Sequence, residues 1–161
     1  MITIISALSK NNVIGWKNKL PWNIKSEMQH FLSITKNKNV LFGFNTFKNL
    51  PKIYSHWKII VLTKKHQDSL LLKQKNIFVT DNINQIINKY QNSKEDLYIC
   101  GGSQIYKQFL NYAHCLILSI IDKNYIGDAF FPKINYDQFQ LIKIKKYQLF
   151  QVKYYLKKSI K

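Results

Sequence analysis

Short apolar runs recur along the chain and are separated by segments in which apolar residues repeat every three or four positions. The apolar runs indicate β-strands at residues 3–8, 40–42, 58–62, 77–79, 97–100 and 116–121. Helical periodicity lies between several of them, at residues 24–34, 83–90 and 105–110. Strands that alternate with helices predict an α/β fold, with a mostly parallel sheet covered by helices.

The C-terminal part of the chain has a different pattern. Residues 139–147 and 150–158 form two extended runs with no helical segment between them, which predicts an antiparallel hairpin at the edge of the sheet. Lysines on such an edge strand discourage pairing with another molecule. No repeat, linker or low-complexity segment interrupts the chain, so we expect residues 1–161 to form a single domain.

The composition is typical of a folded protein without a membrane span. Hydrophobic residues make up 46% of the chain and aromatic residues 14%, which argues against disorder. No stretch reaches the roughly 18 apolar residues that a membrane span needs, and the apolar run after Met1 has no basic segment before it, so we expect a strand rather than a signal peptide. Cys100 and Cys115 lack metal-ligand spacing, so we expect reduced thiols, no metal and a cytoplasmic location.

The net charge of +17 suggests a second functional class, a protein that binds nucleic acid. However, all 25 basic residues are lysines, and they are spread over predicted strands, helices and turns. Arginine is the commonest specific reader of bases, and the chain has none. The composition therefore favours a solvated surface without a specific nucleic-acid partner, while a lysine-rich nucleic-acid binder is kept as the alternative.

Glu27 is the most informative candidate residue. It lies on the apolar stripe of the predicted helix 24–34, between Ile24, Met28 and Phe31. Burying a carboxylate without a partner costs free energy. One interpretation is that Glu27 lies in the first helical turn, where the helix dipole favours a negative charge. The other is that the carboxylate binds a ligand that offers two parallel N–H donors.

Two predicted strands end in glycine directly before a predicted helix. Residues 43–46 follow the strand at 40–42, and residues 101–104 follow the strand at 97–100. Asn45 and Thr46 are good helix caps, and free amides at a helix start suit a phosphate. Two adjacent glycines allow the backbone to approach a ligand closely. This pattern predicts a phosphate-bearing cofactor at the carboxyl ends of the strands.

Taken together, these residues resemble the dihydrofolate reductase family over nearly the whole chain. The motifs that carry the resemblance are Ile5-Ser6-Ala7-Leu8, Val13-Ile14-Gly15, Leu20-Pro21-Trp22-Asn23 followed by Glu27 and Phe31, Gly43 with Thr46, Gly101-Gly102 with Tyr106, and Gly127-Asp128 before Phe131-Pro132. The Leu-Pro-Trp segment followed by a carboxylate is the most specific of them. The resemblance implies an eight-stranded sheet with about four helices, no metal, and reduction of 7,8-dihydrofolate to tetrahydrofolate with NADPH; we expect a monomer.

The resemblance also implies roles for individual residues. Glu27 would hold the 2-amino and N3 edge of the pteridine, Ser119 would bridge the carboxylate and the amino group, and Trp22 would hold a water nearby; Leu20 and Tyr106 complete the expected catalytic set. The implied substrate-binding residues are Ile5, Ala7, Glu27, Met28, Phe31, Leu50, Lys52, Lys58, Cys100 and Ser119. The implied cofactor-binding residues are Ala7, Ile14, Gly15, Asn18, Leu20, Gly43, Phe44, Asn45, Thr46, Leu62, Thr63, Lys64, Lys65, Cys100, Gly101, Gly102, Ser103, Gln104, Ile105 and Tyr106. The Gly101–Gly102 peptide would be cis, and Asp122 and Asp128 would lie in a loop that steadies the loop containing Leu20.

The chain departs from the family at the expected site for the folate tail. Trp57 stands where the family generally has an arginine that binds the α-carboxylate of the tail. Arginine grips a carboxylate at two points, which lysine cannot copy, so Lys52, His56 or Lys58 would act as point charges. We therefore expect weaker discrimination for the glutamate tail, and we expect Trp57→Arg to lower the KM for dihydrofolate.

Two more positions depart from the family on the cofactor side. Phe44 and Gln104 stand where cofactor-contacting arginines often occur, so we expect weaker NADPH binding, with NADPH preferred over NADH mainly through Lys64 and Lys65. Within the enzyme class, the alternative is a related pteridine or pyrimidine reductase. A non-catalytic homologue is a further alternative, against which the intact Glu27 argues.

Overall fold

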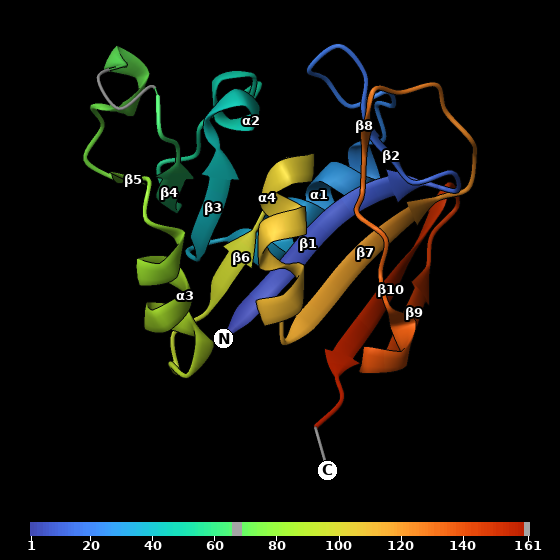
Figure 1. Cartoon of the computed structure of the whole chain (residues 1–161). Coiled ribbons are helices and arrows are strands. Elements are labelled where there is room, and N and C mark those ends of the chain that lie inside the picture. The colour runs from blue at the N-terminus through green and yellow to red at the C-terminus, as the bar shows by residue number, and fades with distance from the viewer. Residues whose placement is uncertain (66–68, 160–161) are drawn as a thin grey trace.

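A computed structural model describes residues 1–65 and 69–159, and its centre is an eight-stranded sheet (Figure 1). The strand order is β5-β4-β3-β6-β1-β7-β10-β9. The bounds of these strands are β1 Ile2–Ser9, β3 Asn39–Gly43, β4 Lys58–Leu62, β5 Ile77–Thr80, β6 Leu97–Ile99, β7 Cys115–Ile121, β9 Phe139–Lys146 and β10 Phe150–Lys157. Among the described strands of this sheet, β10 alone runs antiparallel to its neighbours, β7 and β9. The predicted α/β fold, with its C-terminal hairpin at the edge of the sheet, is confirmed.

Helices cover both faces of the sheet. They are α1 Lys25–Thr35, α2 Phe44–Lys48, α3 Ile83–Gln91 and α4 Ser103–Phe109, with short 3-10 turns at Leu70–Leu72, Leu110–Tyr112 and Tyr136–Gln138. Successive strand residues point to opposite faces, so Ile4 joins the core cluster that contains α3 and α4, whereas Ile5 joins the cluster beside α1 and α2. The two-sided burial explains why β1, with the sequence ITIISALS, lacks alternation of apolar and polar residues.

A second, two-stranded sheet was not predicted from the sequence. It pairs β2 (Val13–Gly15) with β8 (Ala129–Phe130) in antiparallel orientation. Gly127 fits tightly beside it, because a Cβ atom there would lie 2.1 Å from Val13 Cγ1. Strands of three and two residues are too short to produce a periodic signal in the sequence.

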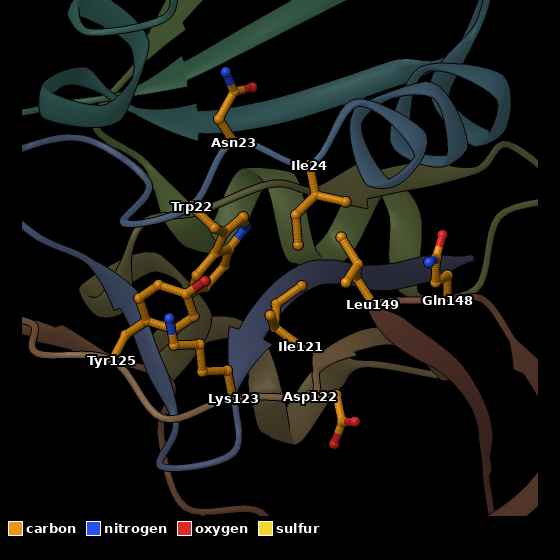
Figure 2. Close-up of a pocket in the computed structure, with 9 residues that line it drawn as sticks. All are labelled: Trp22, Asn23, Ile24, Ile121, Asp122, Lys123, Tyr125, Gln148 and Leu149. Carbon is orange, nitrogen blue, oxygen red and sulfur yellow. The ribbon is translucent and has the colours of Figure 1, made fainter.

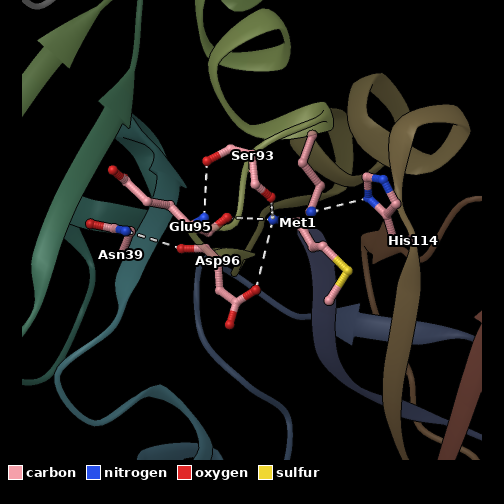
Figure 3. A network of polar contacts seen from close by, with 7 residues as sticks. Met1, Asn39, Ser93, Glu95, Asp96 and His114 are labelled. Carbon is pink, nitrogen blue, oxygen red and sulfur yellow. Dashed lines mark hydrogen bonds and ion pairs between the residues drawn. The ribbon is translucent and has the colours of Figure 1, made fainter.

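The start of β1 is fixed by a polar network at the amino-terminal edge of the sheet (Figure 3). The amino group of Met1 donates to the backbone oxygens of Ser93 and Glu95 and forms a 3.7 Å ion pair with Asp96. The backbone N–H of Ile2 donates to Nδ1 of His114 at 3.1 Å. These contacts join the beginning of β1 to the segments that lead into β6 and β7.

The predicted side-chain caps on α2 are wrong. The helix begins at Phe44 with Gly43 as its N-cap, and no side chain caps it, so Asn45 and Thr46 lie inside the first turn. A Cβ atom at Gly43 would lie 3.0 Å from Cγ1 of Ile105, so the chain turns from β3 into α2 in a space that suits glycine.

Two features are absent from the described residues and bear on the class of the protein. None of the helices in residues 1–65 and 69–159 is long and apolar enough to cross a membrane. The same residues contain no group of three His, Cys, Asp or Glu side chains that could hold a metal ion.

Candidate active site

Glu27 lies buried in the first turn of α1, where its side chain is only 5% exposed. It shares a side-chain hydrogen bond with Ser119 of β7. The two ion pairs among the described residues are Met1–Asp96 and Lys10–Asp122, so neither of them neutralises Glu27. Burial raises the pKa of Glu27 to about 7, and the Ser119 hydrogen bond partly opposes this shift. The position in the first helical turn is confirmed, but the carboxyl group still lacks a cationic partner among these pairs.

Trp22 supplies a second unsatisfied polar group. Its side chain is 7% exposed, and its Nε1 is buried without a hydrogen-bond partner among the described residues. The indole packs edge-on against the ring of Tyr125, with 5.2 Å between the ring centroids. A hollow of about 290 Å³ lies beside these two rings and extends to Gln148 and Leu149 (Figure 2). Glu27 does not line this hollow, so the hollow contacts Trp22 but is not part of the carboxylate site.

Tyr106 joins α4 to β1. Its hydroxyl donates to the backbone oxygen of Ile5 at 2.9 Å, and its ring packs against Phe131. Gly101 has a φ of +111°, and a Cβ atom there would lie 3.2 Å from the Tyr106 hydroxyl. Burial raises the pKa of Tyr106 and also that of the neighbouring Cys100 thiol, so both groups stay protonated at neutral pH.

The ends of β3 and β6 meet at the Gly101–Gly102 peptide, which is cis. The Gly43 N–H donates to the Gly101 oxygen at 2.8 Å. A Cβ atom at Gly102 would lie only 2.9 Å from Oγ1 of Thr46. The starts of α2 and α4 are therefore held close together at the carboxyl edge of the sheet.

The loop that contains Leu20 contacts both the α2 start and the 122–128 segment. Asn45 Nδ2 donates to Asn18 Oδ1 at 3.1 Å. The Lys17 N–H donates to Asp128 Oδ2 at 3.2 Å, so Asp128 touches the loop as expected, whereas Asp122 forms a 2.8 Å ion pair with Lys10. Leu20 itself is 44% exposed.

The other predicted binding residues divide by exposure. Those that are buried or half-buried are Ile5, Ala7, Ile14, Gly15, Met28, Phe31, Gly43, Phe44, Thr46, Leu50, Leu62, Thr63, Cys100, Gly101, Gly102, Ser103 and Ile105. Those that are exposed are Asn18, Asn45, Lys52, Lys58, Lys64, Lys65 and Gln104. The Ser103 hydroxyl donates to the Phe130 oxygen at 2.8 Å, so part of its hydrogen-bonding capacity is already used.

Trp57 is a core residue. Its side chain is 2% exposed and packs against the rings of Phe31, Phe42 and Tyr54. Its Nε1 donates to Thr35 Oγ1 at 3.2 Å. The position that would carry an arginine in the resembling family is therefore apolar and has its hydrogen bond satisfied.

Sequence reasoning did not single out the contacts that hold the 122–128 segment. The Asn11 amide donates to the Tyr125 backbone oxygen at 2.8 Å and accepts from the Tyr125 N–H at 3.1 Å. Residues separated by 114 positions give no local signal of such a pairing.

Comparisons with known proteins agree with one another. The family model described as dihydrofolate reductase matches residues 1–157. The chain is 37% identical over 160 residues to a dihydrofolate reductase of Mycoplasma genitalium, with 99% of each chain covered. It is 34% identical over 158 residues to a Mycoplasma pneumoniae protein named segregation and condensation protein A, of which the match covers 30%. In structure, it resembles a dihydrofolate reductase of Enterococcus faecalis complexed with NADP(H) and RAB-propyl, with a TM-score of 0.85, 21% identity and coverage of 99% and 97%.

Proposed function

The chain belongs to the dihydrofolate reductase family, and we propose that it reduces 7,8-dihydrofolate to tetrahydrofolate with NADPH, with Glu27 as the anchor of the pteridine. One observation supports the anchor most strongly. Glu27 is a buried carboxyl group without a cationic partner in the described ion pairs, next to the hydroxyl of Ser119. Such a group is costly in the free protein, and a ligand edge with two N–H donors would remove that cost.

The cofactor side fits NADPH in its backbone geometry. Gly43, Gly101 and Gly102 pack against Ile105, Tyr106 and Thr46 more closely than a Cβ atom would allow, so the backbone at this edge lies close to the starts of α2 and α4. Thr46 and Ser103 place hydroxyl groups at the same edge, and exposed Lys64 and Lys65 follow β4, where they would contact the 2′-phosphate. When bound, NADPH supplies the hydride, and the chain supplies position and electrostatics.

Each residue of the site would then have a separate role. The Glu27 carboxylate accepts hydrogen bonds from the 2-amino and N3 edge of the pteridine, and Ser119 fixes the orientation of the carboxyl group. Trp22 Nε1, a buried donor, holds a water beside the pteridine. Tyr106 fixes the backbone of β1 at Ile5 and thereby the wall of the ring pocket. Because the pKa of Glu27 is about 7 in the free protein, the carboxyl group populates both protonation states at neutral pH.

The experiment that tests this function follows the loss of NADPH absorbance with dihydrofolate. Glu27→Gln keeps the shape of the side chain but removes its charge, and we expect it to lower kcat/KM by about 100-fold or more at pH 7. The matched control is Glu95→Gln, since Glu95 is the second of the two glutamates in the chain and is exposed. Full activity of Glu27→Gln would refute the anchor, and inactive wild-type protein that still binds NADPH would indicate another pteridine or a pyrimidine as the substrate.

We also propose that the chain acts as a single cytoplasmic domain and as a monomer. The match to a 30% portion of a longer relative supports a unit that folds by itself. Sedimentation at micromolar concentration checks the monomer. Salt-dependent binding of duplex DNA distinguishes the alternative of a nucleic-acid binder, for which the net charge of +17 is the supporting observation.

A further inference from the structure

The edge strand β9 combines free backbone groups, exposed apolar side chains and lysines without a counter-charge. It is the last strand of the sheet, with β10 on its inner side (Figure 1). It has eight residues, whereas β5 at the opposite edge has four. Folds often protect an edge strand by keeping it short, because its unpaired N–H and C=O groups can pair with another chain. The length of β9 gives no such protection.

The register of the hairpin shows which backbone groups of β9 point outward. The Tyr147 N–H donates to the Phe150 oxygen at 2.8 Å, so the backbone of Phe150 faces β9. Alternate residues of β10 share this direction, and Val152 therefore bonds to its partner Lys145. Ile144, the neighbour of Lys145, directs its N–H and C=O away from β10, and no backbone hydrogen bond outside the ladder involves it among the described residues. Ile144 thus offers a free donor and a free acceptor at the sheet edge.

The side chains of β9 alternate between charged and apolar groups. Lys143 and Lys145 lie on one face of the hairpin, with their ammonium groups 5.4 and 5.2 Å from the ring centres of Tyr154 and Tyr147. Ile144 points to the opposite face, and 45% of its surface is exposed. An edge strand with exposed apolar side chains favours association with another chain.

The positive charge of this edge selects against a second copy of the protein. Residues 139–158 include six lysines, and no Asp or Glu follows Asp137 in the sequence. The two ion pairs among the described residues both lie outside the hairpin. Two β9 strands that paired about Ile144 would set Lys143 of each copy opposite Lys145 of the other, and like charges directly opposite are destabilising. Charge complementarity therefore favours an acidic partner.

We propose that the free edge of β9 binds an extended acidic segment of another protein, which adds a further strand to the sheet. Adjacent strands place their side chains on the same two faces, so carboxylates of the segment lie beside Lys143 and Lys145 and its apolar side chains lie beside Ile144. The recognised pattern is an alternation of acidic and β-branched residues. Because β10 separates β9 from β7, which carries Ser119, this binding does not depend on the proposed reaction.

A synthetic peptide tests the proposal on the full chain. The probe is a fluorescein-labelled Glu-Val repeat of about ten residues, and the control is a Glu-Pro repeat of equal charge, whose prolines prevent a strand ladder. Fluorescence anisotropy should show the Glu-Val peptide binding at least about tenfold more tightly, with an affinity that falls as salt is added. Equal affinities, or no binding of the Glu-Val peptide, would overturn the proposal, since attraction to the net charge of +17 needs no strand pairing.

Variants of β9 locate the contact. Ile144→Pro removes the outward N–H but keeps the ladder to β10, so the Kd of the Glu-Val peptide should rise about tenfold while the urea unfolding midpoint changes little. Lys143→Gln combined with Lys145→Gln should raise the Kd about fivefold at low salt. The matched control combines Lys89→Gln with Lys94→Gln, which removes the same charge from exposed positions outside the hairpin. A control pair that weakened binding as much as the β9 pair would refute the assigned surface.

Amide hydrogen exchange decides the matter even if Ile144→Pro does not fold. In the wild-type protein, saturating Glu-Val peptide should slow exchange of the outward amides of Ile144 and Lys146 by about tenfold or more, and it should leave the amides of β5 unchanged. Protection of β5 instead, or of neither edge, would contradict the proposal. A dimer seen in sedimentation without peptide, and dissociated by Ile144→Pro, would identify a second copy as the occupant and overturn the acidic partner.

Discussion

The buried polar groups near the two ends of α1 differ in whether they have partners. At the amino-terminal end, the Glu27 carboxyl group is buried without a cationic partner in the described ion pairs, and Trp22 Nε1 nearby has no hydrogen-bond partner among the described residues. At the carboxyl-terminal end, Thr35 Oγ1 accepts from Trp57 Nε1, and aromatic rings enclose the pair. A fold keeps unsatisfied groups at a cost, so the first end has the character of a binding site and the second that of a core.

The burial of Trp57 gives the departure at the tail site a different meaning. The sequence suggested that Trp57 leaves the folate tail without its two-point grip, and the structure places this side chain inside the protein. Of the three candidates nearby, Lys52 over the Tyr54 ring and Lys58 at the start of β4 are exposed, whereas His56 is half-buried. Any lysine contact with the glutamate tail would therefore be made by point charges in solvent, which bind weakly.

The largest expected effect comes from placing a charge at the carboxyl-terminal end of α1, where the buried polar groups are hydrogen-bonded. Trp57→Arg would put a guanidinium group among Phe31, Phe42 and Tyr54, and we expect it to lower the free energy of unfolding by about 3–5 kcal/mol. The lower KM for dihydrofolate expected from a restored two-point grip would then come with a clear loss of stability. Urea unfolding and steady-state kinetics on the same preparation measure both. Trp57→Phe is the control, and its loss should be about 1 kcal/mol for the Thr35 hydrogen bond plus a small packing term.

The next effect concerns Glu27 at the amino-terminal end of α1, where a substitution is expected to raise the free energy of unfolding rather than lower it. The folded-state pKa of Glu27, about 7, lies above its ordinary value of 4.5, so between these values the folded protein binds more protons than the unfolded chain. Stability from this group is therefore complete below pH 4.5 and is lost as the pH rises through about 7. Relative to wild type, Glu27→Gln should gain up to about 3 kcal/mol of unfolding free energy on going from pH 4.5 to pH 8.

Urea unfolding of both proteins at several pH values checks this difference in stability. The titration of all other groups affects both proteins equally and therefore cancels in the difference. A variant whose stability relative to wild type does not change with pH would mean that Glu27 ionises normally in the free protein. Combined with the activity measurement, a gain in stability would identify Glu27 as a residue kept for function at the expense of the fold.

The smallest expected effect concerns Lys52, the exposed residue that lies over the ring of Tyr54. Lys52→Gln should raise the KM for dihydrofolate by about two- to fivefold at low salt, because exposed ion pairs contribute at most about 1 kcal/mol. The effect should shrink as salt screens the charge, and it should vanish with a dihydropteridine that lacks the glutamate tail. Lys89→Gln on α3 is a matched control of equal charge change. An equal rise of KM for both substrates would argue against a role of Lys52 at the tail.

Much of the fold could be predicted because its signals are local. The strand at Lys58–Leu62 was predicted with its observed bounds, and α1 differs from its predicted range by one residue at each end. The pairing of β2 with β8 could not be predicted, because it joins segments more than 100 residues apart that are too short to show a period. The α2 cap was predicted wrongly because Asn45 and Thr46 are good caps in isolation, whereas the helix begins one residue earlier, at Phe44, beside the close packing of Gly43 against Ile105.

The sequence by itself determined the order of strands and helices, the family and which carboxylate to propose for the site, because periodicity, glycine placement and motif spacing are properties of the chain alone. Only the tertiary structure decided which polar groups are satisfied. Trp57 meets Thr35 across 22 residues, Ser119 reaches Glu27 from another strand, and His30 Nε2 finds no partner among the described residues. Burial and hydrogen-bond partners depend on atoms brought together by the whole fold, and these set the pKa of a carboxyl group.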